Sequence, residues 1–171
     1  MIRVVKNYIL KKTNGIPLNI YFINLIFQKF FRIDSDCRFS KNFTSRVQCP
    51  EKITIENNCI YVRRSFAISG GCYFQACRGI EIGEKTFFAH GVTIVSMQHD
   101  ISDVTKIGKN GAVKIGRNCW IGAKATIMPG VILGNNTIVG ANSVVTKSFP
   151  DGNIVLAGIP AKIIKEIKID K

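Results

Sequence analysis

The sequence predicts an all-β protein, a parallel β-helix built from six-residue repeats. From residue 115 onward an aliphatic residue returns at every sixth position, at Ile115, Ile121, Ile127, Leu133, Val139 and Val145. The position four residues later is small or β-branched, at Cys119, Ala125, Val131, Thr137 and Ser143. Neither the 3.6-residue period of an α-helix nor the two-residue period of a strand explains this spacing. A fixed repeat of this kind is typical of a solenoid of stacked coils.

Three hexads close one triangular coil if each supplies a short strand and a corner, so that the chain completes one turn every eighteen positions. Each aliphatic residue then stacks inside the coil on its equivalent in the next one. A glycine follows the aliphatic position at four hexads, at Gly116, Gly122, Gly134 and Gly140, which suits tight packing near a corner. Asparagines, which tolerate left-handed backbone angles, stand nearby at Asn118, Asn135, Asn136 and Asn142.

The repeat continues toward the N-terminus with two irregularities. The same phase appears at Ile82, Phe88 and Ile94 and, more loosely, at Ile55, Ile68 and Phe74. Phe74 and Ile82 are eight residues apart, which predicts a small bulge near residues 78–79. Ile94 and Ile115 are 21 residues apart, so we expect residues of about 96–112 to leave the coil as an extruded loop. A loop for which the coil has no packing use is a candidate for function.

The chain divides into three expected parts. Residues 1–50 form a helical or irregular segment, 51–150 the β-helix, and 151–171 a tail. The apolar stretch from Ile16 to Phe31 is interrupted by Asn19, Asn24, Gln28 and Lys29, before the roughly 20 residues that a membrane span requires. It predicts an amphipathic helix whose apolar face packs on the domain or on a partner subunit. The alternative is that this face rests on a bilayer, with its basic flanks toward the lipid headgroups.

Composition narrows the function. The net charge of +13 is spread along the chain without a helix-turn-helix pattern or a basic-aromatic RNA motif, so we expect no nucleic-acid partner. The six cysteines include no C-x-x-C pair, so neither a disulfide framework nor a zinc site is expected. The first residues do not resemble a signal peptide. The expected location is therefore the cytoplasm, or the inner face of its membrane.

The segment IGRNCWIGAKATIMPGVILGNNTIVGANSVVTKSF, followed by GIPAKIIKEI, closely resembles the hexapeptide-repeat acetyltransferases. The closest resemblance is to the maltose, galactoside and polysaccharide O-acetyltransferases, and it covers residues of about 53–167. It implies a left-handed coil, a homotrimer with active sites between subunits, and acetyl-CoA as the donor.

The resemblance assigns the general base to His99, within Ser96-Met97-Gln98-His99-Asp100 at the start of the expected loop. The other histidine, His90, lies inside a hexad and is assigned to the coil surface or the acceptor side. An imidazole with a pKa near ~6.5 can take the proton of a sugar hydroxyl as that oxygen attacks the thioester. We expect direct transfer, because Cys72 and Cys119 fall on the small hexad position, where packing explains them without an acyl-enzyme. Asp100 or Asp103 is expected to orient His99.

The resemblance also supplies a set of cofactor-binding residues. The N–H of Ala123 would stabilise the oxyanion, and Trp120 would line the pantetheine arm unless it packs only as a corner aromatic. Ala141, Thr146 and Lys147 would lie along that arm. Lys162 and Lys165 would face the CoA phosphates unless they are simply solvated.

The acceptor pocket departs from that of the galactoside enzymes, because their coil Asn and Asp are missing from residues 70–76. Gln75 and His90 are the candidate acceptor-binding residues, and a sugar or surface polysaccharide is the expected acceptor. N-acetylation of a nucleotide-linked amino sugar and a non-enzymatic scaffold remain alternatives. A zinc-dependent β-helical carbonic anhydrase needs three histidines, and this chain has 2.

Overall fold

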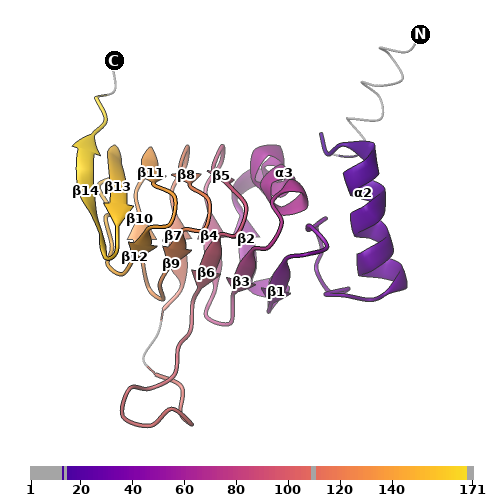
Figure 1. The fold of residues 1–171 in the computed structure, drawn as a ribbon, viewed down its shortest axis with the longest axis horizontal. Coiled ribbons are helices and arrows are strands. Elements are labelled where there is room, and N and C mark those ends of the chain that lie inside the picture. Colours follow the sequence, from indigo (N-terminus) through magenta and orange to yellow (C-terminus); the bar gives the residue numbers. More distant parts are fainter. Residues whose placement is uncertain (1–12, 14, 109–110, 169–171) are drawn as a thin grey trace.

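The computed structural model describes residue 13 and residues 15–108 and 111–168, and its main body is a parallel β-helix (Figure 1). The first sheet contains β1 (Arg46–Gln48), β3 (Tyr73–Gln75), β6 (Thr93–Val95), β9 (Thr126–Ile127) and β12 (Val144–Val145). The second contains β2 (Ile53–Ile55), β4 (Ile80–Ile82), β7 (Val113–Ile115) and β10 (Ile132–Leu133). The third contains β5 (Phe87–Phe88), β8 (Trp120–Ile121), β11 (Thr137–Val139), β13 (Ile154–Gly158) and, antiparallel at its edge, β14 (Ala161–Glu166).

The strand register confirms that one coil takes three hexads. Lys114 pairs with Ile132, Thr126 with Val144, and Trp120 with Ile138. The repeating aliphatic residues lie inside the coils: Ile115, Ile121, Ile127, Leu133, Val139 and Val145. Together with the small residues of the hexads they form one continuous buried column. Burial of this apolar column is the main favourable term in the stability of the solenoid.

Both predicted irregularities are present. Tyr73 pairs with Thr93, 20 positions later, and the extra residues form a turn in which the N–H of Gly79 donates to the carbonyl of Ala76. Ile80 pairs with Val113, 33 positions later. Since one coil takes eighteen residues, fifteen residues of this interval are extra. They leave the body between β6 and β7 as the extruded loop, which projects away from the sheets in Figure 1.

The first coil contains a helix that the repeat did not predict. In place of a third strand it has α3 (Ile60–Ile68), after two short 3₁₀ turns, η2 (Pro50–Lys52) and η3 (Glu56–Asn58). Ile68 therefore ends a helix, and assigning it to a coil strand is wrong. The ring of Phe66 lies 4.7 Å from that of Phe74 and 4.8 Å from that of Phe88. The helix thus closes the open end of the apolar column.

The predicted N-terminal helix is present as α2 (Leu18–Leu25), continued by the π-helical turn η1 (Ile26–Phe30). It lies at the end of the coils opposite β14 (Figure 1). Its apolar face does not pack on the body of its own chain, because the polar residues Asn24 and Gln28 are buried there, whereas Phe22 and Phe30 are exposed. No helix in the described part of the chain is long and apolar enough to cross a membrane.

Glycines after the aliphatic positions allow the coils to stack at backbone contact. A Cβ on Gly122 would lie 2.6 Å from the amide nitrogen of Ala141, one coil later. A Cβ on Gly134 would lie 2.2 Å from the carbonyl oxygen of Pro150. Since the obstructing atoms are backbone, they cannot move aside as a flexible side chain would.

We therefore expect Gly122→Ala to lower the free energy of unfolding by about 1–3 kcal/mol, the usual cost of overpacking. Gly111→Ala is the matched control, since its Cβ would come no nearer than 3.5 Å to the Cα of Gly130. Urea denaturation followed by circular dichroism measures both variants. Equal stability of the two would contradict the role assigned to the Gly122 contact.

Candidate active site

The root of the extruded loop is held by the strand of the previous coil. The N–H of Met97 donates to the side-chain Oε1 of Gln75 at 3.0 Å, and the buried Oγ of Ser96 donates to the Gln75 carbonyl at 2.8 Å. The N–H of Arg78 donates to the same Oγ at 2.9 Å. Gln75, a candidate acceptor-binding residue, therefore has its side-chain oxygen engaged in fixing the direction in which the loop leaves the coil.

His99 stands on the outgoing arm of this loop. It pairs with Ile107 on the returning arm, and the N–H of Asp100 donates to the carbonyl of Lys106 at 2.9 Å. The N–H of Gly108 donates to the carbonyl of Gln98 at 3.0 Å. These bonds give the loop a hairpin-like base, and the side chain of His99 is exposed on it.

The carboxylates of the loop accept hydrogen bonds from residues of their own turns. Asp100 accepts hydrogen bonds from the hydroxyl and the N–H of Ser102, which lower the pKa of its carboxyl group. Asp103 accepts in the same way from Thr105 and forms an ion pair with Lys106 at 3.1 Å. No carboxylate in the described part of the chain is hydrogen-bonded to His99. Asp100 and Asp103 lie close to His99 in the sequence, but their hydrogen bonds stabilise the turns of the loop and do not orient the imidazole.

A second group of predicted residues stacks on another edge of the prism, where the chain passes from the third sheet to the first; we call it the amide edge. The N–H of Lys124 donates to the carbonyl of His90, and the N–H of Asn142 to the carbonyl of Ala123, both at 2.9 Å. His90, Ala123 and Ala141 therefore occupy equivalent corners of successive coils. The N–H of Ala123 has no acceptor among the described residues, so it is available to a bound oxyanion.

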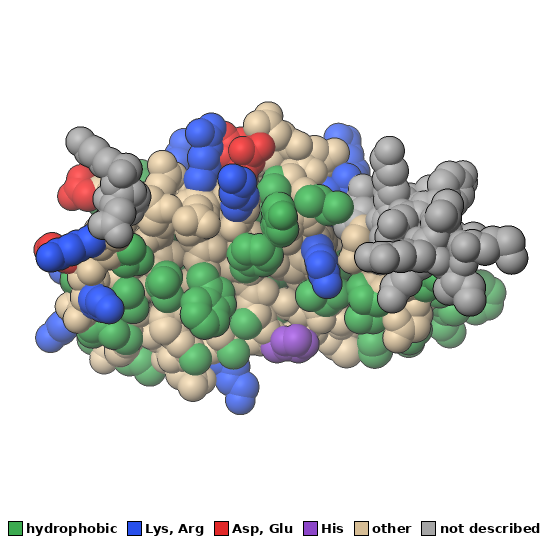
Figure 2. Space-filling view, turned by 90° about the horizontal axis from the view of Figure 1, so that it is seen from above, with side chains coloured by type: hydrophobic (Ala, Val, Ile, Leu, Met, Phe, Trp, Pro, Cys, Tyr) green, Lys and Arg blue, Asp and Glu red, His purple; other side chains and the backbone are tan. Residues whose placement is uncertain are grey.

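Beside the amide edge, the outward face of the third sheet carries an apolar ladder, consisting of Phe87, Trp120, Ile138 and Val155. These residues pair in register across the four strands, and Trp120 is 56% exposed. Lys165 pairs with Val155 at the end of the ladder. Figure 2 shows hydrophobic side chains gathered across one face of the molecule, with Lys and Arg side chains among and around them.

Only Trp120 of this ladder was singled out from the sequence. Phe87 and Ile138 occupy the same place in their hexads, one residue before the buried aliphatic position. Because side chains alternate along a strand, the residue before a buried position faces outward. An apolar residue at this place in successive hexads is the sequence pattern that would have identified Phe87 and Ile138. Lys162 and Lys165 are exposed on β14, where they pair with Ala157 and Val155.

Thr146 and Lys147 lie apart from the other candidate cofactor residues. They follow β12 and so lie on the edge where the chain passes from the first sheet to the second. The extruded loop leaves from the same edge, which we call the loop edge. The Nζ of Lys147 lies 5.5 Å from the ring centroid of Phe149. Thus the structure groups these two residues with the loop, and groups Trp120, Ala123 and Ala141 around the amide edge.

The two edges are separated by the width of the first sheet. Its strands begin at the amide edge and end at the loop edge, and a three-residue strand spans roughly 10 Å. Within one chain, the loop that carries His99 therefore leaves from the edge opposite Ala123, whereas His90 and Ala123 lie on adjacent coils of one edge. The described residues include no group of three His, Cys, Asp or Glu side chains that could hold a metal ion.

Comparison with curated proteins identifies relatives. The family model described as "Bacterial transferase hexapeptide (six repeats)" matches residues 112–147. WbbJ of Escherichia coli K12, named for O-acetyl transfer in lipopolysaccharide biosynthesis, is 32% identical over 152 residues, which cover 82% of this chain and 76% of the relative. The galactoside O-acetyltransferase of the same organism is 39% identical over 113 residues, or 63% of this chain. The chain spans about half of that enzyme, 54% of its length.

Solved structures share the fold. A maltose O-acetyltransferase from Clostridium difficile 630 superimposes with a TM-score of 0.56 at 27% identity, covering 97% of this chain and 88% of that one. A galactoside acetyltransferase in complex with coenzyme A gives a TM-score of 0.50 at 26% identity, covering 73% and 63%. The chain therefore belongs to the hexapeptide-repeat acetyltransferases, has their left-handed parallel β-helix, and is an enzyme of the acyltransferase class.

Proposed function

We propose that this protein transfers an acetyl group from acetyl-CoA to a hydroxyl of a sugar or surface-polysaccharide acceptor. The observation that carries the proposal is an exposed histidine on a loop anchored to coils whose amide edge presents the N–H of Ala123, which no described residue accepts. The O-acetyl transfer named for WbbJ and the galactoside enzyme supports the reaction type. The coenzyme A held by the galactoside acetyltransferase structure supports the donor.

In the proposed reaction His99 takes the proton of the acceptor hydroxyl while that oxygen attacks the thioester carbonyl carbon. The carbonyl oxygen becomes an oxyanion and accepts a hydrogen bond from the N–H of Ala123. The C–S bond then breaks, and the CoA sulfur receives the proton from the His99 imidazolium. One ester forms, one thioester is consumed, and the base is regenerated.

Direct transfer is favoured because the cysteines inside the coils are poor nucleophiles. Cys72 is 2% exposed and Cys119 is 1% exposed. Burial raises the pKa of both thiols, which disfavours the reactive thiolate. Their packing role explains them without an acyl-enzyme intermediate.

We assign the apolar ladder to the pantetheine arm of CoA, with Trp120 near the thioester end. The ladder leads across β13 to Lys165, and Lys162 lies on the same strand. Neither lysine forms an ion pair with the described residues, so both are open to the CoA phosphates. The assignment requires only side chains of the third sheet and the amide edge.

We propose that the working form is a homotrimer in which His99 of one copy meets the amide edge of the next. The loop of His99 leaves from the edge opposite Ala123 and projects away from its own coils (Figure 1), so a neighbouring copy could receive it. His90 stands on the amide edge one coil before Ala123 and is assigned to the acceptor side. We place this assembly in the cytoplasm.

The purified protein should transfer radiolabelled acetyl from acetyl-CoA to the hydroxyl groups of oligosaccharides. His99→Ala should lower kcat by about 10²-fold or more, because the hydroxyl then loses its general base. Its Kd for CoA, measured by calorimetry, should change less than twofold, since the apolar ladder and β14 are untouched.

His90→Ala is the control for this experiment, as the only other histidine in the chain. It should retain most of kcat and raise the KM for the acceptor. An equal loss of kcat in His90→Ala would contradict the assignment of His99 and would point to His90, on the amide edge, as the general base. Transfer confined to an amino sugar or to serine would refute the O-glycan assignment.

Gln75→Ala should lower kcat about tenfold, because the N–H of Met97 loses its partner and the loop root is released. Gln75→Glu should restore activity, since a carboxylate oxygen can also accept from Met97. Gln48→Ala is the matched control, a glutamine of the same sheet in the preceding coil whose side chain contacts Tyr73 instead. Loss of stability without loss of kcat in Gln75→Ala would contradict the positioning role.

A further inference from the structure

The orientation of α2 is set by hydrogen bonds on its polar side. Asn24 and Gln28, one helical turn apart, are 0% and 5% exposed. Asn24 donates to the carbonyl of Ala67 at 3.0 Å and to the hydroxyl of Ser40 at 3.2 Å, and accepts from the N–H of Phe43 at 3.1 Å. Gln28 donates to the carbonyl of Phe39 and accepts from the N–H of Lys41, both at 3.1 Å. Breaking these buried bonds would be costly, so the helix cannot roll to bury another face.

The opposite side of the helix is consequently apolar and exposed. Residues at every fourth position form one row along it, which we call the outer stripe: Leu18, Phe22, Ile26 and Phe30. They are 40%, 55%, 49% and 79% exposed. A row of this length and character on one helix face is typical of a contact surface.

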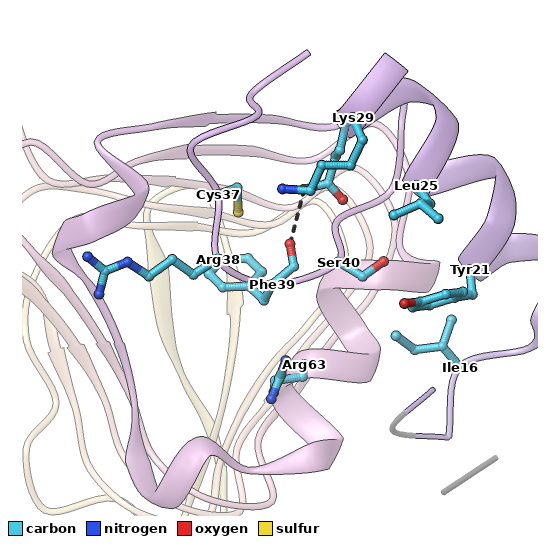
Figure 3. Close-up of a pocket in the computed structure, with 10 residues that line it drawn as sticks. Ile16, Tyr21, Leu25, Lys29, Cys37, Arg38, Phe39, Ser40 and Arg63 are labelled. Carbon is cyan, nitrogen blue, oxygen red and sulfur yellow. Dashed lines mark hydrogen bonds between the residues drawn. The ribbon is translucent and has the colours of Figure 1, made fainter. Parts of the chain in front are cut away.

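Cationic side chains line a cavity on the flank of the same helix that adjoins the body. The cavity has a volume of about 240 Å³ and lies between α2, the segment of residues 37–40 and α3 (Figure 3). Lys29, Arg38 and Arg63 line it, no Asp or Glu does, and none of the three forms an ion pair with the described residues. The first 33 residues of the chain contain six Lys and Arg residues and no Asp or Glu.

We propose that the outer stripe and this basic cavity form a docking surface for a bilayer that contains anionic lipids. The stripe enters the boundary between headgroups and acyl chains, and the three cations bind lipid phosphates. Charge complementarity selects this occupant, because a second copy placed on the same surface would bring its own cations against these. This step rests on the proposed homotrimer: with its three chains parallel, three such surfaces lie at one end of the assembly and bind the same bilayer at once.

The test is flotation of the full-length protein with vesicles. It should float with vesicles of two parts phosphatidylcholine to one part phosphatidylglycerol, remain behind with phosphatidylcholine alone, and be released from the anionic vesicles at high salt. The double variant Phe22→Ser/Phe30→Ser should bind at least tenfold more weakly. Ile101→Ser/Val104→Ser is its matched control, since these loop residues are 96% and 72% exposed yet lie far along the chain.

The cations are tested in the same way. Arg38→Gln/Arg63→Gln should weaken binding to the anionic vesicles by about tenfold, whereas Arg46→Gln/Arg64→Gln, with the same change of net charge outside the cavity, should have a smaller effect. Acetyl transfer to a soluble oligosaccharide should be unchanged in the Phe22→Ser/Phe30→Ser variant and in both arginine variants, which separates this inference from the proposed reaction. Circular dichroism confirms that each variant is folded.

Two results would overturn the inference. One is wild-type protein that does not float with anionic vesicles. The other is a Phe22→Ser/Phe30→Ser variant that floats as well as the wild type. A change in molar mass by light scattering in that variant, with no vesicle binding by the wild type, would assign the outer stripe to a contact between copies instead.

Discussion

Successive coils stacked at backbone contact impose the constraint on which the rest of this structure depends. At Gly122 and Gly134 the next coil comes so close that no side chain fits, and the aliphatic column fills the interior. Extra residues can therefore leave only at an edge of the prism. The chain does this at the bulge after β3 and, most extensively, between β6 and β7, whereas in the first coil α3 takes the place of a strand. A rigid body of this kind presents its irregular segments in fixed directions, which is what a catalytic loop requires.

The same geometry decides how the reacting groups are distributed. The loop of His99 leaves from the loop edge, where Gln75 holds its root, and the N–H of Ala123, unpaired among the described residues, lies on the amide edge. The first sheet separates the two within one chain. A base and an oxyanion donor at opposite edges of a prism become neighbours when prisms pack side by side, and this links the proposed chemistry to the proposed homotrimer.

The hexad period was sufficient to predict the coil length, the buried column and the limits of the loop, because every coil must close after three hexads. It could not reveal α3, since Ile68 and Phe74 happen to be one hexad apart although Ile68 belongs to a helix. The apolar pattern also did not reveal which side of α2 faces the body of its own chain, because hydrogen bonds to Asn24 and Gln28 outweigh apolar packing there. The partners of Asp100 depend on loop geometry that no periodic pattern encodes.

The central claim, that His99 and Ala123 act together across two copies, is tested most directly by mixing two inactive variants. His99→Ala removes the base. Ala123→Pro removes the N–H, and Lys124 follows with a φ of 57°, as in turns that accept proline at the preceding position. Circular dichroism checks that this variant is folded, and Ala123→Gly keeps the N–H as control. Each of the two variants alone should lose about 10²-fold in kcat. Co-expressed chains should recover about a quarter of wild-type activity, since a quarter of randomly formed interfaces combine an intact His99 with an intact Ala123. Activity that stays at the level of the separate variants would show that both groups act within a single chain.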